Sequence, residues 1–138
     1  MLCIFRSCDL HIHIALQVLH EPPMLFHRDI RWPNVVRHAE DPSLWFLIDW
    51  DDAAGSNNAA ADHLDERSHS PQVFQNNHGG EVDIWGVGKL IEDSAGVAFN
   101  ISPELVNLGK VMMQERPTAR EALGFVKKYA SQSRTFCV

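Results

Sequence analysis

The spacing of hydrophobic and polar positions changes along the chain, from a helical pattern to a strand pattern and back. Residues 9–20, DLHIHIALQVLH, are apolar on nearly every side and predict a buried helix with Asp9 as its N-cap. The following Glu-Pro-Pro ends this helix. Two short β-type runs, VVRH and LWFLID, flank the turn sequence AEDPS and predict a small hairpin.

Helical spacing returns at Glu81 and persists to the end of the chain. The run EVDIWGVGKLIEDSAG predicts a helix that stops near Gly96. Ser102 as a cap and Pro103 at the first helical position predict the start of the next helix. In the last helix, TARE forms a capping box, and the tail after Ala130 is expected to fray. The positions expected to face inward are Val82, Trp85, Leu90, Ile91, Leu105, Leu108, Met112, Leu123, Val126 and Tyr129.

Residues 53–80 lack either period and are rich in Ala, Asn, Asp, Ser, His and Gly. This composition predicts a long, mobile loop. The chain shows no internal repeat. The fold class predicted for residues 1–138 is therefore a single domain, mainly α with a small β-hairpin (α+β).

Composition narrows the function classes. The chain has 138 residues, of which 45% are hydrophobic and 22% charged, as in a folded globular domain. The net charge of −6 argues against nucleic acid as a partner, because phosphate binding requires a basic face. No stretch approaches the ~20 consecutive apolar residues of a membrane span, and the start MLCIFRSC is interpreted as ordinary chain. We expect neither nucleic acid nor membrane among the partners.

The cysteines and histidines do not indicate a metal site. Cys3, Cys8 and Cys137 match no zinc-binding spacing and are interpreted as reduced thiols, so an intracellular location, cytoplasmic or nuclear, is expected. His11 and His13 could hold a metal if they lay on a strand, but on a helix they diverge. We favour ordinary polar positions for both.

Polar side chains flank the predicted hairpin. Asp29 precedes its first strand and Asp49 follows its second, so the returning chain can bring both carboxylates and Asn34 together. Oxygen donors of this kind suit Mg²⁺. Arg31 lies near Asp29 and could neutralise a transferred phosphoryl group. The spacing alone therefore permits half of a phosphoryl-transfer site.

Five segments resemble the C-lobe of eukaryotic-type protein kinases, in the family's order. HRDIRWPN (27–34) resembles the catalytic loop, and DWD (49–51) the metal-binding segment. SPQVF resembles the end of the activation segment, here 49–72. VDIWGVG resembles the central helix, about 81–93, and ERPTAREAL resembles a late helix within about 103–130. The chain thus looks like a divergent, partial kinase domain that lacks the N-lobe.

The resemblance implies roles for the residues around the hairpin. Asp29 would be the catalytic base, assisted by Arg31, and Asn34 with Asp49 would bind Mg²⁺. ATP and Mg²⁺ would be the cofactors, and a protein Ser/Thr the acceptor. No cofactor-binding residue is identifiable, because the chain contains neither a Gly-rich phosphate loop nor the family's lysine strand. The isolated chain is therefore expected to be inactive.

The resemblance also implies supporting residues. Asp83 would accept hydrogen bonds from the backbone at His27 and Arg28. Arg116 would contact Gln72, which stands where the family has an acid, so a neutral acceptor replaces an ion pair. These contacts would hold the catalytic loop and the activation segment in place.

Three further expectations follow from the departures. Trp32 is expected to pack on the domain surface, with a substrate groove as the alternative. Without the N-lobe, a non-catalytic kinase-like binding or scaffold module is one alternative function. A small-molecule phosphotransferase of the aminoglycoside or choline type is the other, because IDWDDA is similar to a segment of that group. The expected partner is a protein substrate or another partner protein, with possible dimerisation through the surface that the N-lobe would cover.

Overall fold

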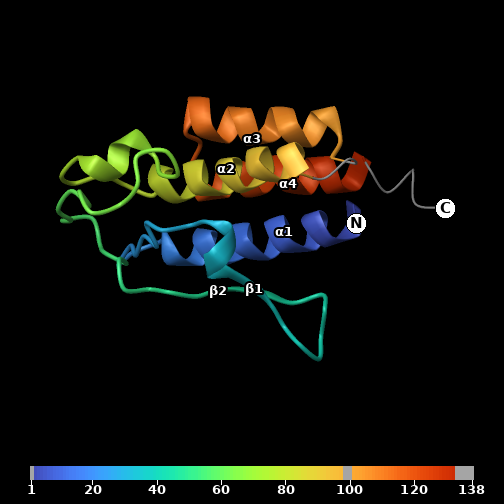
Figure 1. Ribbon diagram of the computed structural model, residues 1–138, viewed down its shortest axis with the longest axis horizontal. Coiled ribbons are helices and arrows are strands. Elements are labelled where there is room, and N and C mark those ends of the chain that lie inside the picture. Colours follow the sequence, from blue (N-terminus) through green and yellow to red (C-terminus); the bar gives the residue numbers. More distant parts are fainter. Residues whose placement is uncertain (1, 98–100, 133–138) are drawn as a thin grey trace.

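The computed structural model describes residues 2–97 and 101–132, and this part of the chain is mostly helical with one small antiparallel hairpin (Figure 1). The predicted fold class, mainly α with a small hairpin, is confirmed. The elements in chain order are α1 (Leu2–Leu19), the 3₁₀ helix η1 (Trp32–Asn34), β1 (Val35–Arg37), β2 (Trp45–Leu47), the 3₁₀ helix η2 (Pro71–Phe74), α2 (Glu81–Val97), α3 (Pro103–Glu115) and α4 (Ala119–Gln132).

The first helix is longer than its sequence pattern predicts. α1 begins at Leu2, so the prediction of Asp9 as its N-cap is wrong, and Asp9 lies within the helix. The apolar residues before Asp9 continue the helical run, and the polar positions among them do not interrupt it. Cys3 and Cys8 fall in α1, whereas Cys137 and the tail after Gln132 lie outside the described residues. No helix in residues 2–97 and 101–132 is long and apolar enough to cross a membrane.

One main core joins the helices to the hairpin. Figure 1 shows α1 between the hairpin and the layer that contains α2 and α4, with α3 beyond α2. Leu16, Ile84, Ile91 and Met112 are buried at the centre of this core. Trp32 packs against the same core, and its Nε1 donates to Ser94 Oγ at 3.0 Å, so the expected packing role is confirmed.

α2 and α3 approach closely because glycines face each other between them. A Cβ atom added to Gly88 would lie 2.6 Å from the carbonyl oxygen of Gly109, and one added to Gly109 would lie 3.0 Å from that of Gly88. Such distances leave no room for a methyl group without backbone movement. The glycines therefore fix the separation of the two helices.

The caps that the sequence predicts for α3 and α4 are confirmed. Ser102 Oγ accepts a hydrogen bond from the Leu105 amide at 3.2 Å. The Thr118 amide donates to Glu121 Oε2 at 2.8 Å, and the Glu121 amide donates back to Thr118 Oγ1 at 3.3 Å. These reciprocal bonds satisfy amides that have no partner inside the helix.

Replacing Thr118 with alanine is expected to lower the free energy of unfolding by about 1 kcal/mol, because an amide at the start of α4 loses its acceptor. Urea denaturation measures the change. Thr118→Ser keeps the hydroxyl and serves as the control, with a loss of roughly half that or less. Equal losses in the two variants would show that the methyl group, and not the cap, matters at this position.

The segment 53–80 is irregular apart from η2, but it is folded against the rest of the domain. Ala61 and Val73 are buried with Val82 of α2 in a small cluster of their own. The side-chain amide of Asn58 donates to the carbonyl oxygens of Gly55 and His78, each at 2.8 Å. The prediction of a long loop is therefore confirmed, and its mobility stays a prediction.

Candidate functional site

A buried carboxylate, Asp29, lies at the centre of the polar network beside the hairpin. Only 3% of Asp29 is exposed. Its Oδ1 atom accepts from His69 Nε2 at 2.7 Å and lies 2.8 Å from Arg31 Nε. Its Oδ2 atom accepts from Asn34 Nδ2 at 2.7 Å. The structure thus brings three sequence-predicted residues together, and adds His69 to them.

The contacts of Asp29 decide its protonation state. Burial by itself raises the pKa of this carboxyl group. Hydrogen bonds from His69, Arg31 and Asn34, together with the charge of Arg31, lower the pKa by more than burial raises it. The net result is a pKa below the usual value for aspartate. Asp29 is therefore a fully hydrogen-bonded carboxylate at neutral pH.

This depressed pKa predicts a loss of stability in acid. A carboxyl group whose pKa is lowered by folding stabilises the folded state above its unfolded pKa of about 4, and that stabilisation disappears as the pH falls through the folded value. We expect the unfolding free energy of the native chain to fall more steeply than that of Asp29→Asn as the pH drops below about 4. Urea titrations at each pH measure both slopes, and identical slopes would contradict the expectation.

A second buried carboxylate, Asp83, holds the loop that carries Asp29. Asp83 comes from the first turn of α2 and is 1% exposed. Its two oxygens accept from the backbone amides of His27 at 2.9 Å and Arg28 at 2.8 Å, and Oδ2 also lies 2.9 Å from His20 Nε2. Arg28 has a φ of 72°, a conformation that these contacts help to impose.

His27 connects this loop to the segment after β2. It is fully buried, its Nδ1 accepts from the Asp29 amide at 3.3 Å, and its Nε2 lies 3.0 Å from the Ile48 carbonyl oxygen. A carbonyl oxygen only accepts, so the ring is assigned a proton on Nε2 and none on Nδ1. The ring also contacts Trp50, with 4.4 Å between the ring centroids.

Arg116 and Gln72 are in contact at the far end of the segment 53–80. With the Gln72 carboxamide oriented so that its oxygen faces Arg116, this oxygen accepts from Nη1 at 3.0 Å and Nη2 at 2.7 Å. In the same orientation the Gln72 amide group donates to Ser70 Oγ at 2.7 Å. The pair fixes η2 relative to the residue that ends α3.

The residues expected to bind a metal are placed differently from one another. Asn34 is buried and directs its amide nitrogen at Asp29, whereas Asp49 is exposed with a φ of 63°. Among the described residues, no three or more His, Cys, Asp or Glu side chains are grouped so that they could hold a metal ion. Binding of Mg²⁺ and ATP stays a prediction.

Ser68 and Asp65 both contact the second ring nitrogen of His69. Ser68 Oγ is 3.0 Å from His69 Nδ1, which is also 2.9 Å from the Asp65 carbonyl oxygen. Sequence analysis missed His69, because nothing in its local pattern indicates a partner 40 positions away.

The outer face of the hairpin is apolar. Leu44, Phe46, Ile48 and Trp50 occupy alternate positions and are 38%, 47%, 42% and 38% exposed. Between them, Trp45 and Leu47 pack inward on the core. Alternation places Leu44, Phe46 and Ile48 on one side of the extended segment. Trp50 follows the left-handed turn at Asp49 and contacts His27 with part of its ring, and we call these four exposed residues the outer stripe.

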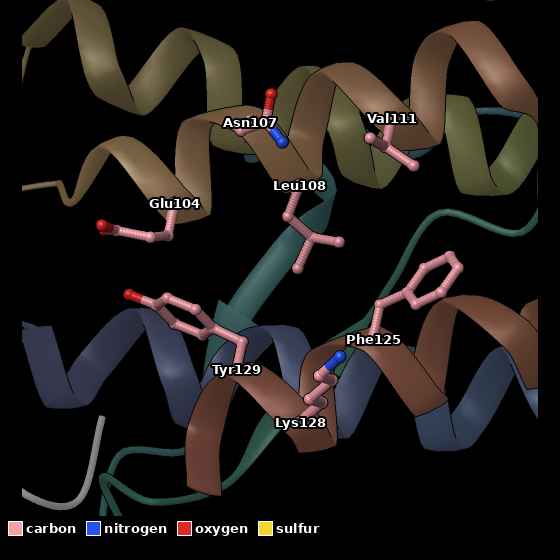
Figure 2. A pocket seen from close by; sticks show the side chains of 7 residues that line it. All are labelled: Glu104, Asn107, Leu108, Val111, Phe125, Lys128 and Tyr129. Carbon is pink, nitrogen blue, oxygen red and sulfur yellow. The ribbon is translucent and has the colours of Figure 1, made fainter. Parts of the chain in front are cut away.

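A second apolar surface lies between α3 and α4. Figure 2 shows Leu108 and Val111 of α3 directed toward the α4 side of an open groove of about 260 Å³, with Phe125 of α4 opposite them. Glu104 and Lys128 also line it. Phe125 is 42% exposed, close to the 47% of Phe46, so the two phenylalanines can be compared directly.

Fold and site define a small α+β domain with a buried polar network and an exposed apolar strand face. No family model matches the chain. The chain is similar to Crinkler effector protein 8 of Phytophthora infestans, with 38% identity over 128 residues. The match covers 86% of this chain and 21% of that protein, so the chain spans about a fifth of its relative.

These comparisons correct the identification made from short motifs. The curated relative is named as an effector and no kinase family model matches, so the identification as a protein-kinase C-lobe is wrong. The kinase function falls with it, as do the kinase-like scaffold and the small-molecule phosphotransferase. Asp29 and Asp83, which carried two of the motifs, are buried and hydrogen-bonded. These hydrogen bonds are a structural reason for a carboxylate at each of the two positions. The roles expected for Asp29, Arg31, Asn34 and Asp49 rested on the resemblance and stay predictions.

Proposed function

We propose that this chain is a protein-binding domain of an effector-type protein, and that it binds its partner through the outer stripe. The observation that carries the proposal is the exposure of Leu44, Phe46, Ile48 and Trp50 on a hairpin whose other face is already packed on the core. In antiparallel sheets with one buried face, the other face is normally polar. An apolar second face is typical of a surface that a further protein layer covers.

The energy available at this surface is sufficient for recognition. Complete burial of a large apolar side chain is worth roughly 1.5–3 kcal/mol, and each residue of the stripe is still about two-fifths exposed. Covering one of them therefore contributes about 1 kcal/mol. Aromatic side chains such as Phe46 and Trp50 are also the residue types enriched at the centres of protein interfaces.

Charges next to the stripe indicate the chemistry of the partner. Three aspartates, Asp49, Asp51 and Asp52, stand directly beside Trp50 in the sequence. Asp49 and Asp51 are exposed, and Asp52 pairs only with His63 among the contacts described, at 2.7 Å. An acidic margin beside an apolar stripe is complementary to a protein surface with an apolar centre and a lysine- or arginine-rich edge.

The test compares two phenylalanines of similar exposure on different surfaces. Phe46→Ser removes the centre of the outer stripe, and the matched control Phe125→Ser alters the α3–α4 groove (Figure 2). Tagged wild-type chain and both variants are expressed in the same cells, and co-purified proteins are quantified by mass spectrometry. Circular dichroism and urea denaturation establish that each variant is folded.

We expect a partner to be recovered with wild type and Phe125→Ser and to fall about fivefold with Phe46→Ser, as a loss of about 1 kcal/mol implies. Raising the salt concentration should also weaken its capture, because the acidic margin attracts it through screened charges. Loss only with Phe125→Ser would contradict the proposal, as would equal recovery with all three chains. If the recovered partner were a second copy of the chain, sedimentation would show a dimer that Phe46→Ser dissociates.

The intracellular location expected from the reduced cysteines stays a prediction.

A further inference from the structure

The side chain of His38 lies on the same face of the hairpin as the outer stripe. Val36 pairs with Phe46 in the hairpin. Two positions further along β1, the His38 amide donates to the Leu44 carbonyl oxygen at 3.0 Å, which continues the same register. Because side chains alternate between the two faces of a strand, His38 lies on the face of Leu44 and Phe46. Its ring contacts that of Phe46, with 5.9 Å between the ring centroids.

One ring nitrogen of His38 is used inside the molecule. Nδ1 accepts from the backbone amides of Glu40 at 3.2 Å and Asp41 at 2.9 Å. A backbone N–H group only donates, so Nδ1 is an acceptor and the proton of the ring is assigned to Nε2. These two hydrogen bonds also fix the direction of the ring relative to the turn that joins β1 to β2.

Further hydrogen bonds hold the shape of this turn. Asp41 Oδ1 accepts from the Ser43 amide at 3.0 Å and from Ser43 Oγ at 2.6 Å. The Leu44 amide donates to the Asp41 carbonyl oxygen at 3.0 Å. The turn is exposed, but its polar groups bond to one another, so His38 stands on a preorganised support.

The other ring nitrogen of His38 is available to a partner. His38 is exposed, and residues 2–97 and 101–132 provide no hydrogen-bond acceptor for its Nε2 atom. A protein that covers Phe46 also approaches this N–H group, because the two rings are in contact. Burying an N–H group without an acceptor costs free energy, so a well-fitting partner supplies one.

We propose that His38 is a specificity residue of the outer stripe, and that its Nε2–H group donates to an oxygen atom of the bound partner protein. Glu40 and Asp41 follow closely in the sequence, and their charges disfavour a carboxylate at this position. The acceptor is therefore a neutral oxygen of a backbone carbonyl or a side-chain amide. The partner places this oxygen at the Leu44 end of the stripe and its basic residues at the Trp50 end, which sets its direction along the hairpin. This inference rests on the proposed function.

The fixed ring is tested on the free, unmodified chain. In the ¹⁵N spectrum of histidine-labelled protein at about pH 8, where histidine side chains are ordinarily neutral, His38 is expected to show an unprotonated Nδ1 and a protonated Nε2. The spectrum of His38→Ala assigns these signals by their disappearance. Shifts averaged between the two tautomers, or a proton on Nδ1, would overturn the proposal.

The contact with the partner is tested by co-purification from the same cells, with the proteins that wild type recovers quantified for each variant. His38→Ala is expected to lower recovery about fivefold, as the loss of one hydrogen bond to a neutral acceptor implies. The matched control Asp41→Ala removes the bonds to Ser43 but keeps the His38 ring, and recovery should stay within twofold. Urea denaturation establishes that each variant is folded.

The same series separates this inference from the proposed function. A loss with Phe46→Ser, together with recovery within twofold for His38→Ala, would overturn the role of His38 and leave the outer stripe as the binding surface. Equal losses with His38→Ala and Asp41→Ala would assign the effect to the shape of the turn, and the direct contact would be wrong. Full recovery with Phe46→Ser would contradict the proposed function, and this inference with it.

Discussion

Replacing Asp83 with alanine is expected to lower the free energy of unfolding by about 3–5 kcal/mol, enough to unfold a small domain of ordinary stability. The Asp83 carboxylate accepts from the backbone amides of His27 and Arg28 and lies 2.9 Å from His20 Nε2, all in or near the core. Alanine leaves these donors without an acceptor, and each buried, unsatisfied amide costs about 1–3 kcal/mol. Urea denaturation measures the loss.

Two further variants separate this effect from a general effect of removing charge. Asp83→Asn keeps one acceptor oxygen and is expected to lose less than Asp83→Ala. Asp93→Ala removes a half-exposed carboxylate of the same helix that pairs with Lys89 at the surface, and its effect should stay within about 0.5 kcal/mol. If Asp83→Ala were no more destabilising than Asp93→Ala, Asp83 would not be the anchor of the loop 27–34.

Gly88→Ala is the second substitution with a large expected effect, a loss of about 2–4 kcal/mol. The added methyl group would lie 2.6 Å from the Gly109 carbonyl oxygen and 2.9 Å from Met113 Cγ. The Gly109 oxygen belongs to the backbone of α3 and cannot move alone, so the two helices must separate. The core residues between them, Ile91 and Met112 among them, then lose contacts.

Substitution of a glycine in α4 is expected to change the free energy of unfolding in the opposite direction. Gly124 is exposed in the helix interior, and a Cβ atom there meets nothing within 4 Å. Gly124→Ala is therefore expected to raise the free energy of unfolding by about 0.5–1 kcal/mol through helix propensity alone. Thermal denaturation of the two variants measures both changes, and a loss of the same size at both positions would refute the close-approach explanation for Gly88.

Local features of this fold could be predicted from the sequence because local residues determine them. The caps of α3 and α4 depend on Ser102, Thr118 and Glu121, which bond to amides within three residues. The hairpin follows from two short β-type runs and a turn between them. The start of α1 was misplaced because a good capping residue, Asp9, also fits inside a helix when apolar residues continue on both sides.

The candidate site could be predicted only in part. His69 reaches Asp29 across 40 positions, and no local pattern encodes such a contact. The outer stripe was missed because LWFLIDW is apolar on both faces, which is also the pattern of a fully buried strand. The kinase identification failed because it relied on short strings around Asp29 and Asp83, whose burial and hydrogen bonds are requirements of this fold.

Footprinting of the chain in complex with its recovered partner tests the central claim most directly. Hydroxyl radicals label exposed side chains, and mass spectrometry compares the labelling of the free and the bound chain at each residue. If the outer stripe binds the partner, Phe46, Ile48 and Trp50 lose labelling in the complex, whereas Phe125, which is similarly exposed on the α3–α4 groove, keeps it. Unchanged labelling at Phe46 and Trp50 in a complex that protects another surface would contradict the claim.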